Sequence, residues 1–384
     1  MKKIIPLLAL AVLSGCGTAS IRKAVEAPLA GHILAQAEAD LDAEPVTVTA
    51  SVCERSAGGI HDFYSEGDYW WPDPKNPDGP YIRRDGESNP DNFSGHRHAM
   101  VAFSCLVGNL CSAWILTGDG RYAAAAEKHL RAWFIDPETM MNPSLEYAQA
   151  IKGVATGRGI GIIDTIHLIE VAQSVIRFSE KGAISRECTE GCKAWFAQYL
   201  EWLTTHPYGI KEMNAKNNHG TWWFVQAASF ASLTGDGKIL GKCREAYKNR
   251  FLPDTMDPDG SFPQELARTK PYNYSIFQLD AMTALCHILS TPEDDLWTYS
   301  TPDGKNIRKA LDFMVPYIAD KESWPYPRDV SHWEEWPVAV PSCVLGWARF
   351  HDRRYLKAWE GFEHFPTGNE MRRNIALRNP LIWL

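Results

Sequence analysis

One turn motif recurs along this chain at nearly equal intervals, and it limits the possible folds more than any other feature. Its first two copies share the run Leu-Thr-Gly-Asp-Gly, with Asp119 and Asp236 as the aspartates, and a looser third copy contains Asp352. These aspartates are 117 and 116 residues apart. Glycine often ends one helix, and aspartate often caps the next. Polar breaks at 179–182 and 298–304 fall about midway between the copies, so the sequence predicts helical hairpins that recur at half this interval.

The segments between these turns have the periodicity of amphipathic helices. Apolar positions recur at three- and four-residue spacing in the ranges 99–116, 162–178, 194–203 and 279–289. Only the short range 46–50 resembles a strand. Each hairpin must bury its apolar faces on its neighbours, and about five hairpins, with one or two more from the N-terminal helices, would close a ring. We therefore predict an all-α fold, an (α/α)n toroid with n about 6–7 and long aromatic loops over its groove. An open solenoid is the alternative, but neither end of the chain shows an obvious polar cap.

The first residues have the features of a bacterial lipoprotein signal. Lys2 and Lys3 precede an apolar stretch, 4–13, that is too short to span a bilayer. Residues 13–16, Leu-Ser-Gly-Cys, resemble a lipobox, in which Cys16 is lipidated and becomes the new N-terminus. We predict a signal peptide at 1–15, a lipid-anchored tether at 16–26 and a single toroid domain at 27–384. Gly17 in place of aspartate favours the outer membrane, so we expect a protein anchored in the outer membrane or the periplasm of a Gram-negative bacterium. The alternative is an ordinary signal peptide with a chance cysteine.

The charge of the chain argues against nucleic acid as a partner. Its formal net charge is −8, and it has no run or stripe of Lys and Arg. A polyanionic substrate would therefore need a local positive site on an acidic body. The hydrophobic content of 45% is ample for a large core.

The cysteines do not form a metal or redox motif. Eight remain after Cys16, and no two have the C-x-x-C spacing, so the sequence predicts neither a metal site nor a cofactor. Cys188 and Cys192 are the closest pair, but several others lie in apolar helical ranges and are expected to be buried thiols. We assign no disulfide and leave the oligomeric state open.

The range 65–90 interrupts the helical pattern with a long loop rich in proline and aromatic residues. Long loops within compact domains are usually functional or disordered, and the adjacent Tyr69, Trp70 and Trp71 argue against disorder. Flat rings on a rigid loop suit the apolar faces of pyranose sugars, and Arg83 with Arg84 would meet carboxylates. Alternatively, the two tryptophans only plug one end of the barrel.

A second polar, glycine-rich loop covers the range 142–161. It has neither the G-x-G-x-x-G nor the Walker spacing and follows no clear strand, which argues against a nucleotide site. We expect Arg158, which lies between glycines, to reach into an open groove together with Tyr147 and Gln149. A flexible connection between helices is the alternative.

The densest group of polar side chains precedes a predicted helix at 224–233. It consists of Asn217, Asn218 and His219, followed by Gly220. A helix N-terminus presents unpaired N–H groups and a partial positive charge, and the Asn and His donors add to them. The segment therefore suits a carboxylate, unless it is only a polar turn with a capping asparagine.

A second stretch, about fifty residues further on, supplies the groups that an elimination reaction on an acidic sugar needs. It contains Glu265, Arg268, Lys270, Tyr272 and Tyr274. The remainder of the chain would then be the scaffold that brings the two stretches together.

These stretches together resemble the alginate-lyase superfamily of α/α-toroid polysaccharide lyases, most closely polysaccharide lyase family 38 and more distantly family 5. The resemblance spans most of the mature chain and is carried by 68–74, 142–161, 217–222 and 268–275. It implies a lyase that acts on β-1,4-linked uronates without a metal. Tyr274 is similar to the family's catalytic tyrosine, and Asn218, His219 and Arg268 match its companion residues.

The chemistry asks for the same residue types. Elimination removes the C5 proton of a 4-linked uronate, and Asn218, His219 and Arg268 would neutralise the adjacent carboxylate and stabilise the enolate. Tyr274 as phenolate takes that proton and as phenol returns one to the leaving O4, which requires C5–H and O4 on the same side, as in mannuronate or glucuronate. For guluronate, His219 is the candidate base. We expect Arg268, helped by His219 or Lys270, to lower the pKa of Tyr274 from about 10 towards about 7.

We expect alginate, including polymannuronate, as the substrate, and glucuronan as the next candidate. Substrate contacts are predicted for Tyr69, Trp70, Trp71, Arg83, Tyr147, Gln149, Arg158, Asn217, Trp222, Glu265 and Tyr272.

Two other functions stay open at the level of sequence. An unsaturated-uronyl hydrolase would need a catalytic aspartate, with Asp164, Asp257 or Asp259 as candidates. A glycosidase more generally needs two carboxylates, and Glu265 is the only one near the core motif. A glycan-binding outer-membrane lipoprotein would also use the aromatic loops, but the Asn, His, Arg and Tyr set would then have no role.

Overall fold

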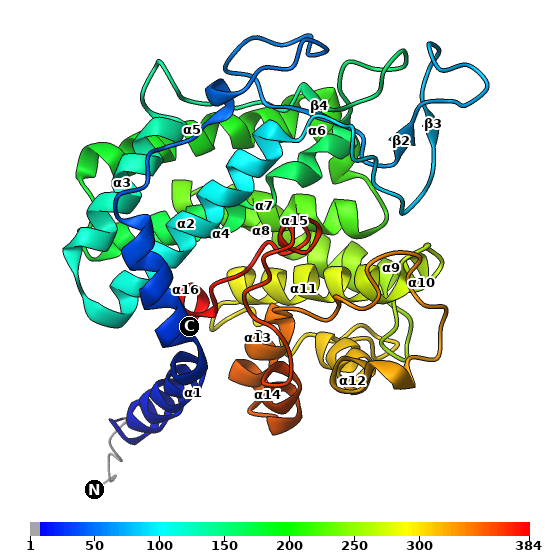
Figure 1. Cartoon of the computed structure of the whole chain (residues 1–384). Helices are drawn as coiled ribbons and strands as arrows, with labels where there is room; N and C mark the ends of the chain where they lie inside the picture. Colours follow the sequence, from blue (N-terminus) through cyan, green and yellow to red (C-terminus); the bar gives the residue numbers. More distant parts are fainter. Residues whose placement is uncertain (1–7) are drawn as a thin grey trace, which may run out of the picture.

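A computed structural model describes residues 8–384, which form an α-helical ring with loops and short strands at one end (Figure 1). Five helical hairpins follow one another along the chain, each with an inner and an outer helix. The inner helices are α2 (Gly95–Thr117), α4 (Leu168–Glu180), α7 (Asn218–Thr234), α11 (Pro271–Leu289) and α13 (Pro341–Phe350). The outer helices are α3 (Gly120–Phe134), α5 (Arg186–Thr205), α8 (Gly237–Ala246), α12 (Ile307–Ala319) and α14 (Arg353–Trp359).

The inner helices pack on one another in chain order, from α2 through α4, α7 and α11 to α13. The long helix α1 (Leu8–Asp40) packs on α2 and also contacts α13, so it lies where the ring closes. The predicted α/α toroid is confirmed. We expected one or two N-terminal hairpins beyond the five, but the described N-terminal region contributes the single helix α1 because residues 41–94 form loops and short strands.

The repeated motif forms the turn inside three of the hairpins, as predicted. Gly118 and Gly235 end α2 and α7 with φ of 71° and 76°, a left-handed conformation that glycine adopts without strain. The aspartate that follows each turn caps α3, α8 or α14 by accepting backbone N–H bonds. In the third copy His351 takes the left-handed position, with φ of 55°.

Helix α1 carries an apolar stripe that we did not predict. Every fourth residue from Ile21 to Ala37 is buried in the main core, through Val25, Leu29 and Ile33. The segment 16–26, which we expected to be a tether, is therefore helical and is packed on the ring from Ile21 onwards. A four-residue spacing places side chains on one face of a helix, and that face binds the ring. Residues 1–7 of the predicted signal peptide lie outside the described residues.

The two polar loops are joined by short strands. β1 (Tyr64–Glu66) pairs in parallel with β4 (Tyr147–Ala150), which connects the loop at 65–90 to the loop at 142–161. β2 (Trp70–Trp71) pairs with β3 (Ile82–Arg83) in antiparallel fashion. Our prediction of a strand at 46–50 is wrong. Val48–Ala50 is a 3-10 turn, η1, because the Thr47 hydroxyl accepts the N–H of Thr49.

The range 162–178, expected to be one helix, is divided. A 3-10 turn, η2 (Gly159–Thr165), precedes α4, and the two are bent by 45° at the break. The remaining short elements are α6 (Pro207–Met213), a π-helix at Tyr247–Phe251, α9 (Leu252–Thr255), α10 (Pro263–Leu266) and the 3-10 turn η4 (Lys321–Ser323). By length and composition α2 could cross a membrane, but 67% of its apolar window is buried in the fold, as in a core helix. All eight cysteines beyond residue 20 are free thiols.

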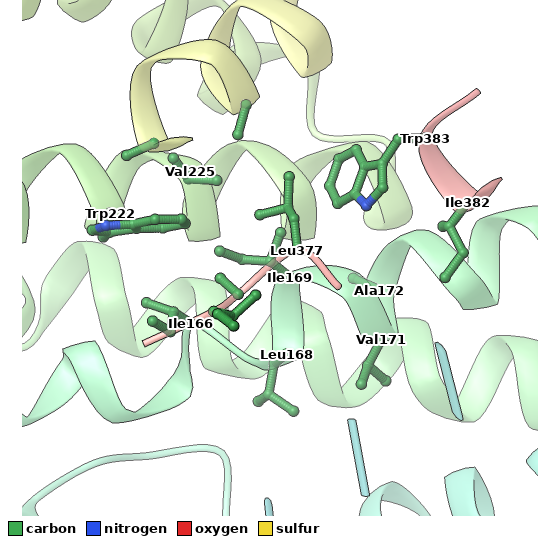
Figure 2. Packing of buried hydrophobic residues seen from close by; sticks show 14 of the residues in the cluster. Ile166, Leu168, Ile169, Val171, Ala172, Trp222, Val225, Leu377, Ile382 and Trp383 are labelled. Atoms are coloured by element: carbon green, nitrogen blue, oxygen red, sulfur yellow. The ribbon is translucent and has the colours of Figure 1, made fainter. Parts of the chain in front are cut away.

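The C-terminal segment, with α15 (Asn369–Arg373) and α16 (Pro380–Trp383), crosses the ring and packs into its core. Figure 2 shows Leu377, Ile382 and Trp383 beside apolar residues of α4 and α7. This packing explains how residues near the end of the chain reach the centre of the molecule.

A fully buried glutamate holds the polar groups of that segment. Glu170 Oε1 accepts the N–H groups of Arg378 at 2.9 Å and Asn379 at 2.8 Å, and Nε1–H of Trp383 at 3.1 Å. Its Oε2 accepts Nδ2–H of Asn379 at 3.0 Å. The segment is therefore fixed on α4 by four hydrogen bonds to one buried carboxylate.

Candidate active site

A cavity of about 380 Å³ opens where four inner helices begin. Its walls include Arg97 from the first turn of α2, His167 just before α4, Asn217 just before α7 and Tyr274 from the first turn of α11. The N-terminus of a helix carries unpaired N–H groups and a partial positive charge. The convergence of four such ends favours an anionic ligand.

The charged side chains of the cavity wall add to this field. The wall contains two aspartates, Asp68 and Asp164, against five arginines, namely Arg83, Arg97, Arg158, Arg268 and Arg373. The chain as a whole has a net charge of −8. The expected local positive site on an acidic body is therefore present.

Tyr274 lies at the contact between two of the predicted segments. Its hydroxyl is 2.9 Å from the hydroxyl of Tyr69, and Nη2 of Arg268 donates to it at 3.2 Å. The Arg268 guanidinium also stacks 4.3 Å from the centre of the Tyr274 ring. Loop 65–90, the turn before α11 and the first turn of α11 thus bring Tyr69, Arg268 and Tyr274 together, and the catalytic roles expected for Arg268 and Tyr274 stay predictions.

The pKa of Tyr274 differs from our expectation. Burial raises it well above its ordinary value, and the neighbouring Tyr69 raises it further. Arg268 lowers the pKa but does not outweigh burial. In the substrate-free protein Tyr274 is therefore a neutral phenol, and the expected shift towards neutral pH is absent. A neutral phenol is ready to donate a proton.

Asn218 is held by a buried carboxylate. Its backbone N–H and its Nδ2–H donate to the two oxygens of Glu265, at 2.8 and 2.6 Å. Burial raises the Glu265 pKa, and the donors of Asn218 partly counter that shift. Glu265 is 2% exposed and does not line the cavity, so our expectation that it binds substrate is wrong. Instead it holds Asn218 in place by accepting its two hydrogen bonds.

The position after His219 must be glycine for a steric reason. A Cβ on Gly220 would lie 2.1 Å from the carbonyl oxygen of Ala215, so no larger residue fits this turn. His219 itself lines the cavity, and its Nδ1 lies 2.6 Å from Oε1 of Glu212 on α6. A carboxylate only accepts, so Nδ1 is the donor and Nε2 is the remaining ring nitrogen.

Arg268 has an acidic partner that we did not predict. Its Nη2 and Nε donate to the two oxygens of Asp85, at 3.2 and 3.4 Å. The Thr269 hydroxyl and Arg83 donate to the same carboxylate, at 3.1 and 2.5 Å. Asp85 lies two residues after β3, so this carboxylate links the aromatic loop to the turn that precedes α11.

A buried network of ion pairs forms another part of the wall. Asp68 bonds Arg97 at 2.5 Å and Arg373 at 2.7 Å, and Arg97 also reaches Asp164 at 3.2 Å. Arg373 also forms an ion pair with Glu370 at 2.7 Å. Burial alone would raise the Asp68 pKa, but Arg373 and Arg97 together lower it to about 2. Sequence reasoning missed this network because its members are far apart in the chain and carry no shared motif.

The second polar loop contributes two predicted residues. Gln149 has φ of 49°, a strained value for a residue with a side chain, and its Nε2 donates to Asp164 at 3.1 Å. Arg158 Nε donates to the Gln149 carbonyl at 2.7 Å, and its guanidinium lies 5.7 Å from the Trp70 ring. Tyr69, Trp70, Arg83 and Asn217 line the cavity as well.

Four further predicted substrate contacts lie elsewhere. Tyr272 is fully buried, and its hydroxyl donates to the Tyr317 carbonyl at 3.0 Å, because two residues along a helix reverse the face. Trp222 is 1% exposed and packs on Phe277 in the core. Tyr147 and Trp71 are half-buried but do not line the cavity.

The aspartates considered for a hydrolase are not arranged as a catalytic pair. Asp164 lines the cavity, but its carboxylate accepts from Ser65, Gln149 and Arg97. Asp257 and Asp259 lie outside the cavity wall, in the turn after α9. Within residues 8–384, no group of three or more His, Cys, Asp or Glu side chains is placed to hold a metal ion.

Comparisons with known proteins agree with this geometry. The family model described as alginate lyase matches residues 47–324. An alginate lyase from Bacteroides ovatus is 32% identical, and the match covers 96% of this chain and 97% of that chain with a TM-score of 0.82. Alginate lyase A1-III from Sphingomonas species A1 is 14% identical over 83% of this chain and 87% of that chain, with a TM-score of 0.52. A variant of A1-III complexed with a tetrasaccharide is also 14% identical, over 81% of each chain, with a TM-score of 0.54. At this identity the A1-III structures show a shared fold alone. No curated protein matches the chain.

Proposed function

The chain belongs to the alginate lyase family of polysaccharide lyases, and we propose that it cleaves alginate by β-elimination in the cavity around Tyr274. One observation carries the proposal: Asn218, His219 and Arg268 surround the cavity that contains the Tyr274 hydroxyl, at the N-terminus of α7. Similarity to the alginate lyase of Bacteroides ovatus over nearly the whole chain supports the choice of substrate.

The first task of the site is to neutralise a uronate carboxylate. Arg268 offers guanidinium N–H groups and Asn218 a second amide hydrogen beyond the one that Glu265 takes, whereas Nε2 of His219 donates only when the ring is protonated. Hydrogen bonds to that carboxylate become stronger as negative charge moves onto it from C5. Because these bonds stabilise the developing negative charge, the C5 proton becomes acidic enough to be removed.

Mannuronate requires both proton transfers on one face, and Tyr274 is the group for both. The phenolate takes the C5 proton, the C4–O4 bond breaks, and the phenol then gives its proton to O4. Since burial raises the pKa of Tyr274, the phenolate forms only in the alkaline range, where Arg268 and the Tyr69 hydroxyl stabilise it. We therefore expect kcat/KM on polymannuronate to rise with pH.

Guluronate places the C5 proton on the opposite face, and two observations favour His219 as its base. Glu212 leaves Nε2 of His219 as the nitrogen that faces a ligand, and Tyr274 is already the neutral acid that O4 needs. Glucuronan shares the mannuronate geometry at C4 and C5 and is a second candidate substrate.

The test is the ultraviolet absorbance of the conjugated double bond that only elimination creates. We expect absorbance to grow when the protein is mixed with polymannuronate or polyguluronate. Tyr274→Phe should reduce the rate by about 10²–10⁴-fold, since it removes the acid in both routes. Tyr272→Phe is the matched control, because this neighbouring phenol is buried away from the cavity and its loss should leave the rate within about threefold of wild type. A Tyr274→Phe rate above about a tenth of wild type would exclude this tyrosine as the acid.

The location of the protein is a separate proposal. The lipobox-like run at 13–16 supports lipidation of Cys16 and attachment to the outer membrane or the periplasmic side. We expect wild type in the membrane fraction and Cys16→Ser in the water-phase fraction of the same cells. Equal partitioning of the two would contradict the anchor.

A further inference from the structure

A buried glutamate stands behind each of the two adjacent residues that face the substrate carboxylate. Glu265 accepts the backbone N–H and one Nδ2–H of Asn218, whereas Glu212 contacts a single ring nitrogen of His219. Glu212 is 5% exposed, and its carboxylate is 2.6 Å from Nδ1. These two glutamates have different consequences, because an amide has one hydrogen-bonding form and an imidazole has two tautomers.

The position of Glu212 is fixed by the packing of α6. Pro207 opens this helix, and the imidazole of His206 caps it by accepting the N–H of Tyr208. A Cβ on Gly209 would lie 2.1 Å from the carbonyl oxygen of Leu203, so α6 fits tightly against the end of α5. Helix α6 also packs on α7 and η2. Glu212 is therefore held at one place relative to the first turn of α7.

This placement decides the state of the imidazole. A carboxylate acceptor keeps the proton of neutral His219 on Nδ1 and leaves the lone pair on Nε2. It also stabilises the imidazolium that forms when Nε2 takes a second proton, because the new charge lies next to a buried anion. Without the carboxylate neither preference would exist.

We propose that Glu212 is a positioning residue that selects the Nδ1–H tautomer of His219 and so makes Nε2 the base for guluronate cleavage. The inference rests on the proposed β-elimination and adds the determinant of substrate range. Nε2 takes the C5 proton, the C5–H electron pair becomes the C4–C5 double bond, the C4–O4 bond breaks, and O4 takes the proton of Tyr274. The imidazolium then loses its proton to water and the phenolate regains one from water, which restores the starting state.

The decisive variant is Glu212→Gln, assayed on both block polymers. Glutamine removes the negative charge, and it either leaves the imidazolium without a counter-ion or donates to Nδ1 and moves the proton to Nε2. Both results weaken the base, but neither changes Asn218, Arg268 or Tyr274, which carry the mannuronate route. We expect the rate on polyguluronate to fall by about 10²-fold or more and the rate on polymannuronate to stay within about threefold. Glu212→Asp, which keeps the charge on a shorter side chain, should recover part of the guluronate rate.

Glu146→Gln is the matched control. Glu146 also faces a histidine, His206, at 3.7 Å, but this pair lies outside the cavity wall. We expect this variant to change neither rate. Thermal unfolding of each variant shows whether a lost rate reflects a lost fold.

The nitrogen spectrum of the His219 ring tests the tautomer without any activity. The ¹⁵N signals that His219→Ala removes belong to this ring, and in wild type we expect a protonated Nδ1 and an unprotonated Nε2. An unprotonated Nδ1 would overturn the inference, and so would equal losses on the two polymers. Absence of ultraviolet absorbance with every polymer would overturn the proposed function instead, while the spectrum would still decide whether Glu212 controls the imidazole.

Discussion

Arg268 is shared between a carboxylate of the protein and the reacting phenol. It donates to both oxygens of Asp85 and to the Tyr274 hydroxyl, and its plane stacks on the Tyr274 ring. This arrangement uses the flat, forked shape of the guanidinium, which a lysine ammonium does not reproduce. An ordinary surface ion pair would contribute less than about 1 kcal/mol and would not affect turnover.

Arg268→Lys is therefore expected to impair catalysis although it keeps the charge. The rate on polymannuronate should fall by about 10²-fold, as when one stabilising donor is removed from an active site. The phenolate would be less stable, and Tyr274 already has a raised pKa, so the rising limb of the pH–rate profile should move to higher pH. The measurement is the pH dependence of kcat/KM beside wild type, with the exposed Arg328→Lys as control. A near-normal rate with an unshifted limb would place Arg268 outside the reaction, and Lys270 would become the candidate.

At the scale of elements, the C-terminal segment brings α15 to the cavity. Arg373 and Asn374 line the wall, and Arg373 bonds Asp68 of the aromatic loop. The segment has no long helix of its own, so its position depends on apolar packing of α16 and on the four donors that Glu170 accepts. Figure 1 shows this segment, in red, crossing the middle of the view, and α16 contacts α2, α4 and α13.

Glu170→Ala should release this segment. Four buried donors would lose their acceptor, and we expect the free energy of unfolding to fall by about 3 kcal/mol. The activity should fall as well, because Arg373 would no longer be held at the cavity. Urea unfolding and limited proteolysis near the C-terminus are the measurements, with Glu180→Ala, on the exposed face of the same helix, as control. Unchanged stability together with a protected C-terminus would contradict this role of Glu170.

The whole molecule combines an acidic body with a basic cavity. The net charge of −8 repels a polyanion at long range, while the five arginines and the four helix N-termini attract it at the site. Binding of a uronate polymer must therefore depend on charges within a short distance of the cavity.

Salt should weaken the capture of substrate more than the chemistry. Between about 0.05 and about 0.5 M NaCl the screening length falls below the size of the cavity, and we expect kcat/KM on alginate to fall about fivefold with a smaller change in kcat. Steady-state kinetics at constant pH measure this, and thermal unfolding in the same buffers controls for stability. A kcat/KM that rises with salt would show that repulsion by the acidic body dominates over the cavity.

The sequence alone determined those features that depend on residues close together in the chain. A glycine in a left-handed turn and an aspartate cap act within about one helical turn, so the repeat at Asp119, Asp236 and Asp352 predicted the hairpins. The polar start of α7 and the pair Arg268 and Tyr274 were visible for the same reason. The range 46–50 was misjudged because a threonine hydroxyl turned the chain where the pattern suggested a strand.

Only the tertiary structure decided which distant groups meet. Asp85, Glu370 and Arg373 carry no local signal, and they reach the site because the ring and the crossing segment bring them there. The rotation of α11 decided that Tyr274 faces the cavity while Tyr272 faces the core. The pKa of Tyr274 also depends on burial, which is a property of the surrounding fold, and burial outweighed the lowering by Arg268 that the sequence led us to expect.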